Sequence, residues 1–369
     1  MANMNIRTPR FYTDLINYYL TTGTAQDGEF DVTATGGSGV TATRGIQTGT
    51  EAELFDMKPL NVVDFDTSGD PDSQVLVTLD LRGSFKKSFV AILNHNLKTA
   101  VGKIRIFAGS TATEADDVDG SGASTSDINW ATLVDAGEVV EVVNGDTITK
   151  ATDSKSVIIE PVTDGSTIIR FTEQSLRYWG IQFEGNTTNT GAATNGTWGG
   201  TDLFVGCILV GEYYDMPVAP DLSVKRSIIF DKVNVLESYG GQRYSNISSL
   251  GRVGSTSKSP FSTSIYQNRT HGGRIVYDMN FSYLASTDVM PTNYDLYEPT
   301  DDAVVEDVWN KTCGRHIPFI FSIDNSTGDG EGDNAESQHI FARFGQDSLD
   351  MEQVAVDVFN VPMRIEEEF

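Results

Sequence analysis

Apolar and polar residues alternate along several short segments, the pattern of strands that bury one face. In residues 75–81 every odd position is Val or Leu, and in residues 103–107 Ile104 and Ile106 share a face while the charged residues point to the other. Residues 89–93 are apolar at every position, which indicates a strand covered on both faces. These three segments predict the centre of a β-sheet core.

Similar patterns continue along the rest of the chain. Residues 157–159 and 168–171 are apolar runs separated by a short polar turn, so we expect them to form a hairpin. Residues 275–283 alternate without interruption and predict a long amphipathic strand. Three more strands are expected at residues 318–323, 339–344 and 354–359.

Two helices are predicted. The first begins with Thr8 as cap and Pro9 at the first helical position and ends at Gly23, although an extended arm is the alternative. Residues 21–50 are rich in Gly and Thr and predict a loop or an irregular hairpin. The second helix covers about residues 300–313, with acidic residues in its first turn, Lys311 in its last turn and Gly314 beyond it.

The apolar strand of residues 89–93 stops at the turn Asn94-His95-Asn96. Together with residues 177–183 and 204–212, this stretch resembles the galactose-binding-like (discoidin-type) jelly roll of tailed-bacteriophage virion proteins. The resemblance covers roughly residues 55–215 and implies a β-sandwich from a tail or baseplate protein. From the residues themselves, we expect the Asn-His-Asn turn to serve the fold and not catalysis, because Asn satisfies turn backbone groups and tolerates left-handed dihedrals.

The length of 369 residues and a Pro-containing segment without periodicity predict more than one domain. Residues 1–54 would be an N-terminal arm with a helix and a Gly/Thr-rich segment, and residues 55–215 the jelly roll. A Pro-containing linker at 216–226 would lead to a β-rich (α+β) domain at 227–369, whose end looks like the C-terminal part of minor tail or baseplate proteins. The predicted fold class is mainly β.

Charge and cysteine content narrow the function classes. With 26 Lys and Arg against 52 Asp and Glu, the net charge is −26, which argues against nucleic-acid and anionic membrane partners. The two cysteines, Cys207 and Cys313, support neither a disulfide framework nor a thiolate metal site. The N-terminus has no export signal pattern and no window is long enough for a membrane span, so synthesis in a cytoplasm is expected.

The sequence shows no catalytic motif. Its four His residues are scattered, and it contains no nucleophile elbow, phosphate loop or His-Glu-x-x-His helix. Two acidic loops, residues 109–127 and 324–336, contain carboxylates that could bind a metal ion. We expect both to be solvated loops instead. No enzyme activity, cofactor or metal is therefore predicted.

The favoured hypothesis is a structural protein of a phage virion, assembled in the host cytoplasm and contacting other virion proteins and copies of itself. A carbohydrate-binding module for host-surface glycans is the alternative, in which Trp130, Trp179 or Trp198 would stack on a sugar. A virion-associated glycan-degrading enzyme is a second alternative.

The predicted subunit contacts are two projecting segments. One is an exposed aromatic face in residues 1–23, and the other is a locally basic loop at residues 238–270 that would meet an acidic neighbour. The predicted interface residues are Phe11, Tyr12, Tyr18, Tyr19, Arg243, Arg252 and Arg269.

Overall fold

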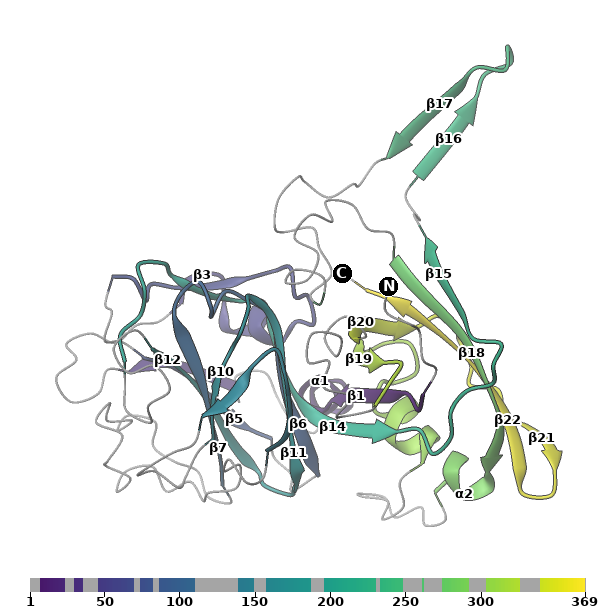
Figure 1. The fold of residues 1–369 in the computed structure, drawn as a ribbon, viewed down its shortest axis with the longest axis horizontal. Helices are drawn as coiled ribbons and strands as arrows, with labels where there is room; N and C mark the ends of the chain where they lie inside the picture. Colours follow the sequence, from purple (N-terminus) through teal and green to yellow (C-terminus); the bar gives the residue numbers. More distant parts are fainter. Residues whose placement is uncertain are drawn as a thin grey trace. The chain divides into compact units, whose positions relative to one another are not determined.

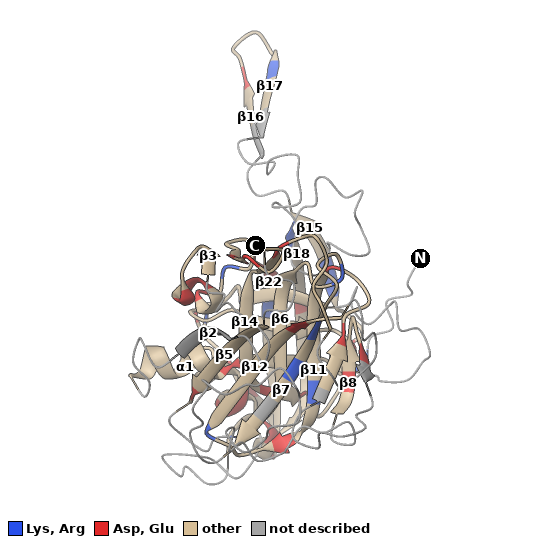
Figure 2. Ribbon diagram, turned by 90° about the vertical axis from the view of Figure 1, so that its left-hand side faces the viewer, with Lys and Arg blue, Asp and Glu red and all other residues tan. Residues whose placement is uncertain are grey.

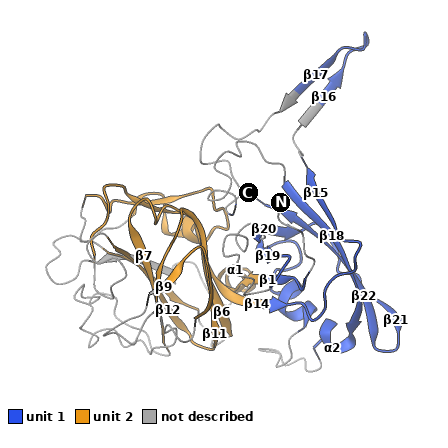
Figure 3. Ribbon diagram, in the orientation of Figure 1, with its two compact units in different colours: residues 1–11, 214–369 blue, residues 12–213 orange. Residues whose placement is uncertain are grey.

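The chain is mainly β, as predicted, and its strands pair antiparallel (Figure 1). It divides into two compact units: unit 2 is residues 12–213, and unit 1 combines residues 1–11 with residues 214–369 (Figure 3). The computed structural model describes residues 7–23, 30–35, 46–69, 74–81, 86–109, 139–148, 157–186, 196–229, 233–247, 261, 274–291, 303–325 and 339–368.

Unit 2 is a sandwich of two sheets. The strands of the first sheet are, in order, β2 (Phe30–Thr35), β5 (Gln74–Asp80), β12 (Tyr178–Gly185), β7 (Gly102–Gly109), β10 (Val157–Glu160) and β9 (Asp146–Ile148). Those of the second are β1 (Arg10–Asp14), β14 (Cys207–Asp215), β6 (Lys87–His95), β11 (Gly165–Gln174) and β8 (Val139–Val143). A smaller sheet holds β13 (Leu203–Val205), β4 (Val63–Phe65) and β3 (Ile46–Thr48).

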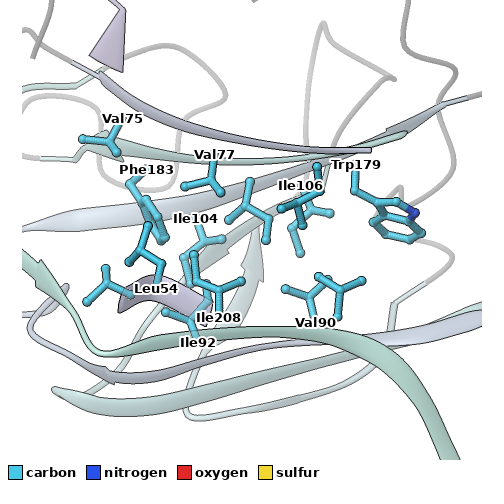
Figure 4. Packing of buried hydrophobic residues seen from close by; sticks show 14 of the residues in the cluster. Leu54, Val75, Val77, Val90, Ile92, Ile104, Ile106, Trp179, Phe183 and Ile208 are labelled. Atoms are coloured by element: carbon cyan, nitrogen blue, oxygen red, sulfur yellow. The ribbon is translucent and has the colours of Figure 1, made fainter. Parts of the chain in front are cut away.

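The core of unit 2 lies between these sheets (Figure 4). Val77 and Ile106 point into it from the first sheet, and Val90 and Ile208 from the second. The alternation predicted for residues 75–81 is confirmed, because side chains two residues apart share a face of a strand. Every residue of β6 is buried, as its unbroken apolar run predicts.

The predicted hairpin of residues 157–171 is wrong. Its two strands pair in different sheets, β10 with β7 and β9, and β11 with β6 and β8. Likewise β8 and β9 belong to opposite sheets, although only Asn144 and Gly145 separate them. The chain passes from one sheet to the other between β8 and β9 and again between β10 and β11. The Asn144 side chain links these two connections: its amide donates to Thr163 O at 3.0 Å and its oxygen accepts from Thr163 N at 2.9 Å.

The N-terminal helix starts later than predicted. Residues 10–14 form β1, and α1 (Leu15–Thr22) begins with Asp14 as N-cap, whose carboxylate accepts from Asn17 N at 2.8 Å. The helix ends as predicted at Gly23, which has a φ of 74° in the left-handed region. Pro9 therefore precedes a strand, because sheet pairing of the following residues outweighs their local helical pattern.

The sandwich also extends further toward the N-terminus than the predicted boundary at residue 55. Leu15, Ile16 and Tyr19 of α1 belong to the core of unit 2, as does Leu54 of the short helix η1 (Glu51–Phe55). Within the expected loop of residues 21–50, β2 pairs with β5 along its whole length. The predicted change of domain after residue 215 is close to the observed division between residues 213 and 214.

Unit 1 is built on a second group of strands. Their order is β15 (Lys225–Ile229), β18 (Arg274–Ala285), β22 (Val358–Glu367), β20 (His339–Phe344) and β19 (Phe319–Ser322), and β21 (Glu352–Ala355) also pairs with β22. A separate two-stranded sheet consists of β16 (Val233–Glu237) and β17 (Arg243–Ile247). Two short helices complete the unit, α2 (Ser286–Val289) and the π-helix η4 (Val304–Asn310).

The predicted linker is part of unit 1. Met216 is buried in its core, and Met216 N donates to Pro9 O at 2.9 Å. Asp215, the last residue of β14 and the neighbour of Met216, accepts from Arg10 Nε at 2.5 Å and from Arg10 Nη2 at 2.8 Å. These contacts fix the segment against the N-terminal residues of the same unit.

The alternation of β18 follows the prediction only as far as Phe281. A register shift against β22 occurs between Phe281 and Leu284, so that Leu284 is buried while Tyr283 is 77% exposed. An extra residue on one strand of a pair, a β-bulge, reverses which residues face the core. The predicted burial of Tyr283 is therefore wrong.

The predicted strand of residues 354–359 is also wrong. It is interrupted by a tight turn at Val356 and Asp357, and Asp357 has a φ of 56°. The residues before the turn form β21 and those after it begin β22. The apolar residues on both sides of Asp357 predicted one continuous strand and did not reveal that the chain reverses here.

The second helix lies where it was predicted, although it is a π-helix. Asp307 accepts from Ala303 N at 2.8 Å at its start, and Lys311 pairs with Asp307 at 2.8 Å. Gly314 follows with a φ of 66°, in the left-handed region that Gly tolerates. Thr300, which precedes the acidic first turn and is the N-cap that the sequence predicts, lies outside the described residues.

A charged cluster is buried on the face of the first sheet that points away from the core. Arg105 Nε lies 2.7 Å from Glu184 Oε1, and Lys103 Nζ lies 3.5 Å from Glu184 Oε2. All three side chains are at most 3% exposed. Burial lowers the pKa of Lys103, and the nearby Glu184 carboxylate opposes this shift.

Replacing Glu184→Gln should lower the free energy of unfolding by about 3 kcal/mol, because two buried cations lose their shared carboxylate. Denaturant unfolding of the full chain measures this effect. The matched control is Glu237→Gln, whose carboxylate pairs with Arg243 at 3.1 Å on the surface and should matter little. Equal losses in the two variants would contradict the importance of burial.

A fragment of residues 12–213 should show a cooperative thermal transition, whereas a fragment of residues 55–213 should not. The shorter fragment lacks Leu15, Ile16 and Tyr19 of the core as well as the strands β1 and β2. Circular dichroism melting of both fragments tests this directly. A cooperative transition of the shorter fragment at the same temperature would show that the sandwich begins at residue 55.

Candidate interaction surface

The predicted aromatic surface of residues 1–23 is wrong, because its side chains are used inside the chain. Phe11 is buried in unit 1, with ring centroids 5.6 Å from Phe319 and 5.2 Å from Phe321. Tyr12 is buried in unit 2 and makes an edge contact with Phe89 at 5.1 Å. Phe11 and Tyr12 are adjacent in a strand, so they point to opposite faces, and both faces are covered.

The other two aromatic residues of that segment lie on α1. Tyr19 is buried in the core of unit 2, and Tyr18 is half-buried against the same core. Neither leaves the exposed aromatic face that a partner would need. Of the predicted contact residues in this segment, none forms an open apolar surface.

The predicted basic loop of residues 238–270 begins as an ordered hairpin. Arg243 is the first residue of β17, and its Nε donates to Glu237 Oε2 at 3.1 Å across the hairpin. Glu237 and Arg243 are the only charged residues of positions 233–247, so the net charge of this segment is zero. Arg252 and Arg269 lie outside the described residues.

The turn of this hairpin explains its register. Leu236 is paired with Tyr244 and Glu237 with Arg243, which leaves a loop closed by Ser238 and Gln242. Ser238 N donates to Gln242 O at 2.8 Å, and Gly241 has a φ of 79°. A three-residue loop with Gly in the left-handed region is a common way to join two strands.

The exposed apolar side chains of the hairpin form what we call the hairpin surface: Val235, Leu236, Tyr239 and Tyr244. Leu236 is 62% and Tyr244 is 56% exposed, and Tyr239 at the tip is fully exposed. Cross-strand partners share a face, so Leu236 and Tyr244 lie on one face and Val235 on the other. Figure 2 shows β16 and β17 mostly in the colour of uncharged residues.

Among the described strands, β16 and β17 pair only with each other. An isolated two-stranded hairpin is marginally stable in water, so exposed Leu and Tyr side chains on it favour burial against another surface. The predicted loop begins only at residue 238 and no strand is predicted at residues 233–237, so Val235 and Leu236 were missed. The available signal was the alternation before the Gly-Gly turn of residues 240 and 241.

The Asn94-His95-Asn96 turn connects separate segments of unit 2, as its predicted role in the fold requires. Asn94, with a φ of 53°, donates through its amide to Pro59 O at 2.7 Å. Asn96 donates to Asp202 O at 2.7 Å and accepts from Phe204 N at 2.8 Å. Both Asn side chains are buried and bind backbone atoms, so they satisfy groups that would otherwise be buried without a partner.

His95 is buried and neutral. Its Nδ1 accepts from Leu97 N at 3.3 Å, so the ring carries its proton on Nε2, which donates to Thr167 Oγ1 at 2.8 Å. Burial lowers the pKa of His95 to about 4, although Asp164 opposes this shift. Each ring nitrogen has a partner within unit 2, so the geometry is that of a structural histidine.

Asp14 is another buried titratable group of this unit. Its carboxylate accepts from Asn17 N and, at 3.2 Å, from Val210 N. Burial raises the pKa of Asp14 to about 6, and these hydrogen bonds limit the rise. The same side chain caps α1 and fixes it to β14.

Two of the three tryptophans that could stack on a glycan, Trp179 and Trp198, are in the interior. Trp179 is fully buried, stacks on Phe171 with centroids 5.3 Å apart and donates from Nε1 to Leu176 O at 3.0 Å. Trp198 is also buried in the core of unit 2, and Trp130 lies outside the described residues. Trp179 and Trp198 therefore present no ring face on which a sugar could stack.

The described part of the chain shows neither a cluster of metal ligands nor a membrane-spanning helix. No three His, Cys, Asp or Glu side chains gather there in a way that could hold a metal ion. The carboxylates Asp116, Asp117, Asp119 and Asp127, and Asp329, Glu331 and Asp333, lie outside the described residues. None of the described helices has the length and hydropathy needed to span a bilayer.

The observed features define a mainly β protein with a β-sandwich unit and an exposed apolar hairpin. In comparisons with known proteins, no protein-family model, curated protein or solved structure matches the chain.

Asp14 and His95 should have opposite effects on stability between pH 4 and pH 6. Asp14 has a raised pKa in the folded state, so its contribution is present at low pH and lost as pH rises through about 6. His95 has a lowered pKa, so its contribution is present above pH 6.5 and lost as pH falls toward 4. The two effects nearly cancel in the wild-type chain.

Single variants separate these effects. On acidification from pH 6 to pH 4, the free energy of unfolding of His95→Gln should rise by about 2 kcal/mol relative to wild type, and that of Asp14→Asn should fall by about as much. Urea unfolding at several pH values measures both. The double variant is the control and should follow the wild-type pH dependence; parallel curves for all four proteins would refute the assignment.

Proposed function

We propose that this protein is a structural subunit of a multi-subunit assembly and that the hairpin surface contacts a neighbouring subunit. The observation that carries the proposal is the hairpin of β16 and β17, which pairs with no other described strand and exposes Leu and Tyr side chains. Burying apolar area contributes about 25 cal/mol per Å², so covering Val235, Leu236, Tyr239 and Tyr244 would stabilise an assembly.

The composition of the hairpin supports this role. Tyr is enriched at the centre of protein interfaces, where charged residues are depleted. On a chain of net charge −26, residues 233–247 contain one acidic and one basic residue, which pair with each other. Copies of an acidic chain repel one another, so a neutral apolar segment is a favourable place for close approach.

The assembly that we propose is the virion of a tailed bacteriophage, with the protein in the tail or baseplate. This rests on the resemblance of residues 89–107, 177–183 and 204–212 to the galactose-binding-like jelly roll of virion proteins. Parts of those segments form strands β6, β7, β12 and β14 of the two-sheet sandwich, and a jelly roll is likewise built from two sheets. Its partners would be copies of itself and other virion proteins, and it would act without catalysis.

A double variant in the hairpin, Leu236→Ser with Tyr244→Ser, tests the proposal. We expect the wild-type chain to associate as its concentration rises and the variant to associate on the order of tenfold more weakly, because the apolar pair on one face is removed. Sedimentation velocity over a range of concentrations measures the difference.

The matched control is Val162→Ser with Tyr283→Ser. It also removes one aliphatic and one aromatic side chain that are more than half exposed, but outside the hairpin. It should associate like the wild-type chain. A hairpin variant that sediments like both would show that these side chains do not form a subunit contact.

A further inference from the structure

The sheet of unit 1 has two open edges. Strand β15 pairs only with β18, and β21 pairs only with β22, among the strands that the structure describes. Residues 351–357 are exposed throughout, and so is β15 except at its half-buried middle residue, Ser227. Open edges offer unpaired backbone N–H and C=O groups, and proteins usually protect them.

Strand β15 is basic and apolar. It contains Lys225 and Arg226, followed by Ile228 and Ile229, and has no acidic residue. Ile228 is 52% exposed. The Arg226 guanidinium lies 5.7 Å from the ring centroid of Tyr277, on the strand that pairs with β15, and the side chain remains exposed.

The other edge is acidic and apolar. Residues 350–357 contain Asp350, Glu352 and Asp357 and have no basic residue. Val354 is 55% exposed and Val356, at the turn, is 87% exposed. The two edges of one sheet are therefore complementary in charge, and both expose branched aliphatic side chains.

We propose that β15 of one copy of this protein pairs with β21 of the next copy, so that the sheets of successive subunits are joined edge to edge. Backbone hydrogen bonds would supply affinity, and the opposite charges would select this pairing over β15 with β15 or β21 with β21. The inference rests on the proposed function, since it names the partner and a second surface for the same assembly.

Side-chain order favours a parallel alignment of the two strands. With Arg226 opposite Glu352, a parallel alignment places Ile228 opposite Val354, so an opposite-charge pair and an apolar pair lie on the same face. An antiparallel alignment with the same ion pair places Ile228 opposite Asp350, which is unfavourable. Parallel pairing thus satisfies charge and hydrophobicity together.

The sequence indicates that the partner at each open edge is a second copy of this protein. Strand β15 is basic in a protein of net charge −26, and an acidic edge complementary to it occurs on the same sheet. Strand β15 ends at residue 229 and the hairpin begins at residue 233, so the edge is continuous in sequence with the other proposed contact. Because the two edges differ, the contact is head-to-tail and builds rings or filaments instead of closed dimers.

Charge reversal on each edge provides the test. In sedimentation velocity of the full chain, Arg226→Glu and Glu352→Arg should each weaken association on the order of tenfold, because attraction becomes repulsion. The double variant should recover wild-type association, and so should an equimolar mixture of the two single variants. The control Glu173→Arg changes the net charge as Glu352→Arg does, at an exposed site of unit 2, and should have no effect.

Thermal unfolding first establishes that each variant is folded. Single reversals that associate like wild type, a double variant that stays weak, or a wild-type chain that remains monomeric would each overturn the edge pairing. The hairpin variants give an independent result in the same assay. If only the hairpin variant loses association, the hairpin contact is supported and the edge pairing is refuted. If only the charge variants lose association and recover it in combination, the edge pairing is supported and the hairpin contact is refuted.

Discussion

Burial of alternate side chains between the two sheets of unit 2 is the constraint on which the rest of that unit depends. Val77 and Ile106 from one sheet meet Val90 and Ile208 from the other, and all four are fully buried. Dense packing of this kind holds the sheets at a fixed separation, so each chain segment that passes between them must do so at a defined corner. The hydrogen bonds of the Asn144 side chain to the backbone of Thr163 meet this requirement at one such corner.

Polar groups that the packing removes from water are retained because they have partners. Glu184 lies against Arg105 and Lys103, and His95 bonds at both ring nitrogens. Such groups add little net stability compared with apolar residues of the same size, but losing one partner is costly. They therefore favour one arrangement of strands over its alternatives, and the turn at His95 has a structural reason to be polar.

Unit 1 differs in that its surface exposes apolar side chains and open strand edges. The hairpin surface and the strands β15 and β21 expose aliphatic and aromatic side chains on a chain whose high negative charge otherwise keeps copies apart. Selective association at a few neutral or complementary places is what a subunit needs in order to assemble in one way only. The contrast between a repelling surface and local attractive edges is the physical basis of the proposed role.

The sequence by itself determined the features that depend on neighbours along the chain. Period-two alternation defined most strands, and Gly23 marked the end of a helix, because side-chain direction and left-handed backbone are local properties. Only the tertiary structure decided which strands pair and which apolar side chains are covered. Phe11 and Tyr12 are predicted to be exposed and are buried, whereas Leu236 lies in a strand that the sequence pattern did not predict and is exposed. Pairing and burial depend on residues far apart in sequence, and a local pattern does not contain that information.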